Sequence, residues 1–217
     1  MQKHIRILAL ALLFGLCLHS CLAETAGDEW RPSMKELLRL GVEETDERGM
    51  EIPQRFQFDY SEIVCRVDGV DRSVATSGCG ATSVSMVIEY LTGNTEQNPL
   101  QLFSTSVKSG RYKGFGWSHE TLAHYAHAYG VQTQWFSGDE AQIREYLNAG
   151  KPVIAHMGPG VFTDVGHFIV LRGVTESGKI LINDPNSREN CALAFPLSLI
   201  LSQTKGEDPF MACWVNQ

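Results

Sequence analysis

Basic residues are scarce in this chain, and they do not cluster. The sequence has 18 Lys and Arg residues against 25 Asp and Glu residues, which gives a formal net charge of −7. Proteins that bind nucleic acid or anionic membranes usually present basic patches to the phosphate groups. The composition therefore argues against both kinds of partner. We expect the acidic excess to serve solubility.

Long apolar runs are also lacking beyond the first residues. Lys3 and Arg6 precede an apolar stretch over Ile7–Leu18, and a small-residue site follows that ends at Ala23. This is the three-part layout of a secretory signal peptide, and the stretch is shorter than the roughly 20 residues that span a bilayer. We expect residues 1–23 to be a signal peptide and the mature chain to carry no transmembrane segment.

The processing of this segment has an alternative. Leu18-His19-Ser20-Cys21 partly resembles a bacterial lipoprotein box, which would leave the mature chain anchored by a lipid at Cys21. The histidine does not fit that box, so cleavage after Ala23 is the preferred prediction. In both cases the sequence predicts a bacterial protein that is secreted or held in the cell envelope.

Cysteines are few and widely spaced. Of the six in the chain, Cys65, Cys79, Cys191 and Cys213 follow the predicted signal. An exported protein can form disulfides, but a chain of this size does not need a disulfide framework to fold. If Cys79 is a working thiol, at most one bridge can form among the other three. Cys191 with Cys213 is one pairing to consider.

The chain has no internal repeat and no low-complexity tract. Its 217 residues, 43% of them hydrophobic, suit one domain of moderate size. Residues 24–52 are polar and charged, and they are predicted to form a lead-in segment with an amphipathic helix near Met34–Leu40. The compact domain is predicted to span residues 53–217.

Helical signals dominate the first half of this domain. The clearest is a helix over Thr82–Leu91, because its apolar residues recur at helical spacing and Gly93 supplies a stop. Capping residues or amphipathic spacing predict three further helices, and a short strand precedes the last of them. The helices span residues 98–107, 118–129 and about 139–148, and the strand spans residues 131–136.

Apolar β-branched runs dominate the second half. Strands are predicted over Pro152–Met157, His167–Val174 and Lys179–Asn183, and the turn residues 175–178 make the last two a hairpin. A short helix near residues 196–203 and a last strand around residues 210–215 complete the chain. Helices followed by antiparallel strands indicate an α+β domain.

Cys79 lies between two glycines, where the chain enters the predicted buried helix. The positive end of a helix dipole favours a thiolate, and the backbone N–H of Cys79 could donate to an oxyanion. Gly78 and Gly80 would let the backbone approach a substrate carbonyl. A small buried cysteine at a tight turn fits the same pattern. The local sequence leaves both interpretations open.

A nucleophilic thiol needs a base, and three histidines do not suit that role. His119, His124 and His127 fall on one predicted helix. Five positions at about 100° each place His119 and His124 roughly 140° apart around the helix, so they cannot share a metal ion. No other metal-ligand spacing is present, and we expect these three to be surface residues.

His156 and His167 fall on predicted strands, and His167 begins the most apolar of them. Such a residue can be a hydrogen-bonded core histidine. In the predicted hairpin, however, Asp184 returns to the end of the sheet at which His167 lies. A carboxylate there would fix the imidazole tautomer and stabilise the imidazolium. This juxtaposition favours His167 as the base and Asp184 as its partner. The alternative is that Asp184 is only a turn residue before Pro185.

Three motifs in this order resemble a known family. They are SGCGATS at residues 77–83 with Met86 after it, GHFIVLRG at residues 166–173, and INDP at residues 182–185. Over residues 53–217 the chain is similar to the papain-fold cysteine peptidases related to bacteriocin-processing, double-glycine-leader peptidases. The resemblance implies an α+β papain-like fold in which N-terminal helices pack on an antiparallel sheet.

The resemblance also assigns roles to residues. It implies that Cys79 is the nucleophile, His167 the base and Asp184 its partner. It implies a glutamine that holds the oxyanion, for which Gln57 fits the family pattern best and Gln54 second. Ala81 stands where the family often has proline. No cofactor and no metal ion are implied. Because no ATP-binding region follows, we expect a free-standing exported form.

Three functions remain open from the sequence. The first is a thiol hydrolase that cleaves peptide bonds in a peptide or protein substrate through a thioester. The second is a cell-wall amidase or an acyltransferase with the same triad, because the motif does not specify the acceptor. The third is a non-catalytic binding module on the same scaffold. The oligomeric state is not predicted.

Overall fold

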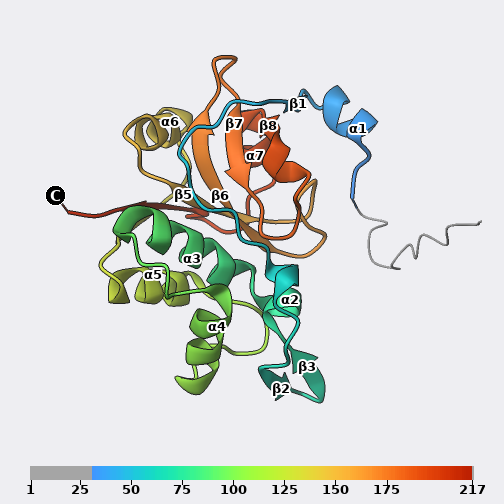
Figure 1. Cartoon of the computed structure of the whole chain (residues 1–217). Helices are drawn as coiled ribbons and strands as arrows, with labels where there is room; N and C mark the ends of the chain where they lie inside the picture. Colours follow the sequence, from blue (N-terminus) through green and yellow to red (C-terminus); the bar gives the residue numbers. More distant parts are fainter. Residues whose placement is uncertain (1–30, 217) are drawn as a thin grey trace, which may run out of the picture.

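A seven-stranded sheet separates two groups of helices in the computed structural model, which describes residues 31–216 (Figure 1). All neighbouring strands are antiparallel, in the order β1-β8-β7-β6-β5-β9-β4. The strands are β1 (Glu43–Glu44), β4 (Gln132–Phe136), β5 (Val153–Met157), β6 (His167–Val174), β7 (Ile180–Asn183), β8 (Leu193–Phe195) and β9 (Phe210–Trp214).

Helices cover both faces of this sheet. One face packs against α3, α4 and α5, and the other against α6 and α7. The α-helices are α1 (Met34–Arg39), α2 (Val74–Ser77), α3 (Cys79–Thr92), α4 (Pro99–Lys108), α5 (His119–Ala128), α6 (Glu140–Asn148) and α7 (Leu197–Ser202). Two 3₁₀ turns, η1 (Gln57–Asp59) and η2 (Asn190–Ala192), and a hairpin of β2 (Cys65–Val67) and β3 (Val70–Arg72) complete the fold.

Strand β6 lies in the middle of the sheet and is buried on both faces. Phe168 and Val170 belong to the core under α3, whereas Ile169 and Leu171 belong to the core under α6 and α7. A strand with two buried faces is mostly apolar, which explains the run Phe168–Leu171 in the sequence. The first residue of this strand, His167, is therefore rigidly held.

Helix α3 is enclosed between the sheet and its neighbours α4 and α5 (Figure 1). Its residues Gly80–Ile88 are all buried. Gly93 ends it in the left-handed region with φ 70°, as the sequence predicts. Asn98 caps α4 through a capping box, with Pro99 in its first turn. The expected α+β architecture, with helices packed on an antiparallel sheet, is confirmed.

The sequence analysis does not predict the shortest elements. Strands β1 and β8 have two and three residues and pair with each other at one edge of the sheet. They are too short to show a period. The β2–β3 hairpin does leave a signal, because Asp68 and Gly69 both have positive φ between paired Val67 and Val70. An Asp-Gly pair is typical of such a two-residue turn.

The segment before the central helices pairs at the sheet edge through β1 and then crosses the strands toward α2 (Figure 1). Leu37 and Val42 are buried, and the backbone N–H of Met50 donates to the carbonyl of Arg172 at 2.7 Å. Helix α1 corresponds to the helix predicted near Met34–Leu40. The predicted signal peptide lies outside the described residues. Within residues 31–216, no helix has the length and apolar character needed to cross a membrane.

Candidate active site

Cys79 is the first residue of α3, directly after the short helix α2. Gly78 joins the two helices, and a Cβ atom there would lie 2.4 Å from Cγ1 of Val74. Only glycine allows this close join, which sets the direction in which α3 starts. Cys79 is half-buried, so its thiol stands at the positive end of a buried helix and keeps access to solvent.

His167 and Asp184 are joined by a hydrogen bond between Nε2 and Oδ1 at 2.7 Å. Only 5% of the His167 surface and 1% of the Asp184 surface are exposed. The β6–β7 hairpin brings them together, as the sequence predicts. Because Asp184 occupies Nε2, Nδ1 is the ring nitrogen that remains for Cys79, with which His167 interacts electrostatically.

Charges stabilise each other across these three residues. Burial acts to raise the pKa of the Cys79 thiol, but interactions with His167 and with the backbone of Phe168 and Gly80 outweigh it, and the pKa lies below the ordinary value. Burial acts to lower the pKa of His167, but Asp184 and then Cys79 raise it to about 10. Both directions favour a thiolate beside an imidazolium, which is the form that a nucleophilic cysteine requires.

Gln57 lies between the two parts of this site. Its side-chain Nε2 donates to the carbonyl of Ala75 in α2 at 2.8 Å, and its backbone N–H donates to the carbonyl of Pro185 at 2.8 Å. It thus links the segment before Cys79 to the residue after Asp184. The other candidate glutamine, Gln54, is exposed beside Arg172. The structure brings Gln57, and not Gln54, to the helix that precedes the thiol.

The loop after β7 folds around Asp184 and includes residues that sequence reasoning missed. Oδ1 also accepts from the backbone N–H of Asn186 at 2.8 Å, and Oδ2 accepts from Nδ2 of Asn190 at 2.7 Å. The Asp184 N–H donates to the Cys191 sulfur at 3.1 Å. The only signal in the sequence is a run of loop-forming polar residues after Asp184. It predicts a loop but does not show which of its residues bind the carboxylate.

His119 corrects an expectation. His124 and His127 are exposed, as predicted, but His119 is half-buried, with its Nε2 3.0 Å from Nδ1 of His156. Its ring stacks on Trp135 at 3.8 Å. The helix start packs over the sheet, a contact between segments far apart in the sequence. Burial lowers the pKa of both histidines, that of His156 to about 4, and so favours the uncharged form of the pair.

The cysteine pairing considered above is not formed. Among residues 31–216, the four cysteines are all free thiols. Cys191 lies in η2 beside β8, whereas Cys213 lies in β9, and three strands separate β8 from β9 in the sheet. Burial raises the pKa of both thiols, that of Cys191 to about 12. Both behave as small buried side chains.

Comparison with known proteins gives the same family as the motifs. The model of the Peptidase_C39-like family matches residues 50–195. A search of curated proteins found no match. The fold is similar to that of a putative C39-like peptidase from Bacillus anthracis, with 16% identity and a TM-score of 0.55 over 79% of this chain and 99% of that one.

A second solved structure has the same fold. It is the peptidase domain of Streptococcus ComA, a bifunctional ABC transporter involved in quorum sensing, with 17% identity and a TM-score of 0.51. The match covers 71% of this chain and 98% of that domain. At such identities the likeness concerns the fold. Together with the family match over most of the chain, it shows that this protein belongs to the Peptidase_C39-like family of papain-fold cysteine peptidases.

Proposed function

We propose that this protein is an exported thiol peptidase in which Cys79, His167 and Asp184 form a catalytic triad. The observation that carries the proposal is the buried His167–Asp184 pair, joined by a 2.7 Å hydrogen bond, together with its interaction with Cys79 at the start of α3. The lowered pKa of Cys79 and the raised pKa of His167 agree with it. Export is proposed from residues 1–23 of the sequence alone.

The reaction begins from the thiolate–imidazolium pair, in which the proton of the Cys79 sulfur has passed to His167. The thiolate then attacks the scissile carbonyl carbon, which forms a C–S bond and places negative charge on the carbonyl oxygen. We assign the stabilisation of this oxyanion to the Cys79 backbone N–H and to Gln57. One N–H of the Gln57 amide already binds Ala75, and the other remains for the oxyanion.

Collapse of this intermediate breaks the C–N bond. His167 gives its proton to the leaving amine, and a thioester on Cys79 remains. Water then attacks the thioester carbonyl, with His167 as the base that takes its proton. The C–S bond breaks, the new carboxyl group leaves, and the Cys79 thiolate beside the protonated His167 is restored. Asp184 stays hydrogen-bonded to the imidazole throughout and stabilises its positive charge.

Cleavage of peptide bonds can be separated from related reactions by product analysis. Purified protein would be incubated with peptide libraries and with peptidoglycan, with and without added amines, and the products identified by mass spectrometry. We expect new peptide termini, because water is the acceptor in the proposed reaction. Products from peptidoglycan alone would indicate an amidase instead, and amine adducts would indicate acyl transfer. Protein alkylated beforehand at Cys79 is the control.

Alkylation of Cys79 tests the triad without a substrate. Because the pKa of this thiol is lowered, its rate with iodoacetamide should begin to fall at a lower pH than that of an ordinary thiol. The half-buried Cys65 gives an internal comparison in the same tube. Mass spectrometry of the two cysteine-containing peptides measures both rates. A non-catalytic binding module would show the same pH curve at Cys79 and Cys65.

A further inference from the structure

Asp184 is held by more than its bond to His167. Its carboxylate is buried, and each of its oxygens accepts a hydrogen bond from a protein group. Oδ1 accepts from His167 Nε2 and from a backbone N–H, whereas Oδ2 accepts from Asn190 Nδ2 at 2.7 Å. Asn190 is thus the side chain that fixes the oxygen facing away from the imidazole.

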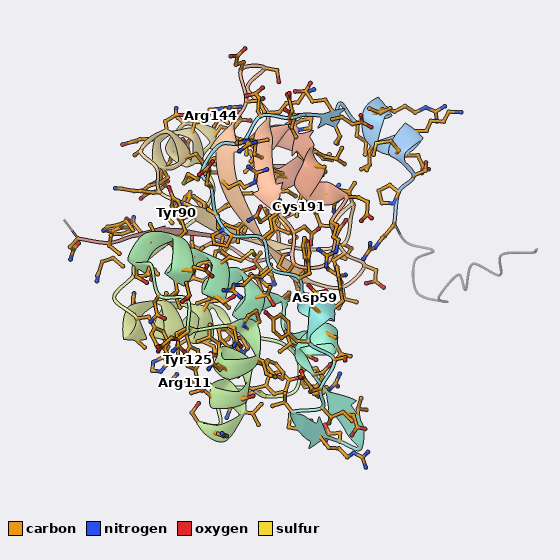
Figure 2. The ribbon with its side chains drawn as sticks, viewed as in Figure 1. Asp59, Tyr90, Arg111, Tyr125, Arg144 and Cys191 are labelled. Carbon is orange, nitrogen blue, oxygen red and sulfur yellow. The ribbon has the colours of Figure 1, made fainter. Side chains whose placement is uncertain are left out.

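The loop that carries Asn190 is closed on itself. The Asn190 backbone N–H donates to Ser187 Oγ at 3.1 Å. The Cys191 sulfur accepts from the Asp184 N–H at 3.1 Å and donates to the Ser187 carbonyl at 3.2 Å. These bonds place the Asn190 amide beside the carboxylate before any substrate binds. Figure 2 labels Cys191 in this region, and Asp59, whose ion pair with Arg188 ties the loop to η1.

A carboxylate with only one fixed oxygen can rotate about its Cβ–Cγ bond. Rotation would move Oδ1 away from the His167 ring and weaken the support of the imidazolium. A donor on Oδ2 prevents this, and it also satisfies an acceptor that burial would otherwise leave unpaired. An uncharged amide does so without a positive charge that would compete with His167 for the carboxylate.

We propose that Asn190 is a positioning residue for the triad, whose side-chain amide fixes the Asp184 carboxylate so that Oδ1 stays on His167 Nε2. This inference rests on the proposed function. Asn190 touches neither the thiol nor the scissile bond in this role. Its effect reaches Cys79 only through Asp184 and His167.

The first test compares Asn190→Ala with Asn148→Ala, a matched change at an exposed position at the end of α6. We expect Asn190→Ala to lower the alkylation rate of Cys79 at pH 6 and the turnover of a cleaved peptide by about 10- to 100-fold, the usual effect of removing a group that orients a functional side chain. KM should stay unchanged. Asn148→Ala should match the wild type in both measurements.

A second variant separates the effect of the Asn190 hydrogen-bond donor from the effect of the side-chain shape. Asn190→Asp keeps the volume of the side chain but places a carboxyl group 2.7 Å from Oδ2 of Asp184. Two carboxyl groups this close share a proton at low pH. The variant should therefore approach the wild-type alkylation rate as the pH falls from 8 to 5, whereas Asn190→Ala should stay slow relative to the wild type. This variant decides the question if Asn190→Ala does not fold.

Proton NMR gives a readout that a merely structural role would not move. In the wild type, the Nε2–H proton bonded to Asp184 should appear as a protected downfield resonance, and in Asn190→Ala it should broaden or vanish while the rest of the spectrum persists. A reactive Cys79 with unchanged rate and resonance in both variants would overturn the role of Asn190 and leave the proposed function intact. A wild-type Cys79 that reacts like an ordinary thiol would overturn both.

Discussion

Peptide turnover should fall by about 10⁴-fold or more when Cys79 is replaced by alanine, because no other group can form the thioester. The fold should persist. Position 79 is the first residue of α3, alanine has the best helix propensity, and the side chain is half-buried. Steady-state kinetics with a cleaved peptide and a thermal unfolding curve measure the two effects.

A matched variant completes this experiment. Cys65 is also half-buried and lies in the β2–β3 hairpin, so Cys65→Ala removes a thiol of similar exposure outside the triad. We expect wild-type turnover from it. Turnover of the Cys79→Ala protein within tenfold of the wild type would mean that Cys79 is not the nucleophile, provided that both proteins unfold at similar temperatures.

His167→Ala should affect both activity and stability. Without the base, turnover should fall by about 10³-fold or more. The change also leaves Asp184 as a buried carboxylate without its charged partner, which typically lowers the free energy of unfolding by about 3–5 kcal/mol. Kinetics and urea unfolding at pH 7 measure these losses. His124→Ala, at an exposed position of α5, should cost less than about 0.5 kcal/mol.

The stability effect should depend on pH in one direction. The pKa of His167 is raised to about 10 in the folded protein, above its ordinary value near 6.5. A raised pKa of a base stabilises the folded state fully below the unfolded value, and this stabilisation is lost as the pH rises through the folded value. The difference in the free energy of unfolding between the wild type and His167→Ala should therefore become smaller as the pH rises toward 10. A difference that grows with pH would contradict a charged His167.

Local sequence patterns predict most of the long elements. The body and the end of α3 follow from an apolar helical period and a glycine stop, although the helix begins at Cys79 and not at the predicted Thr82, and α4 follows from the Asn98 cap and Pro99. The β6–β7 hairpin follows from two β-branched runs around turn residues, and it carries the prediction that Asp184 returns to His167. Each of these signals lies within a few residues of the element that it predicts, so no long-range information is needed.

Local sequence patterns do not predict contacts between segments that are far apart in the chain. The stacking of His119 on Trp135 and its bond to His156 depend on how α5 packs over the sheet. The choice of Gln57 over Gln54 depends on where η1 meets α2. The bond from Asn190 to Asp184 depends on a loop without a period. The family resemblance ranks Gln57 ahead of Gln54, but none of these contacts could be derived from the residues alone.

The sequence by itself determined the order Cys79, His167 and Asp184, the helix that starts at the thiol, and the adjacent strands that carry the other two. Only the tertiary structure decided that Nε2 of His167 faces Asp184, that Gln57 lies beside α2, and that Asn190 secures the carboxylate. The physical reason is that helix and strand periods act over a few residues. The orientation of a side chain in the site is set by two cores, one on each face of the sheet, which form only when the whole chain packs.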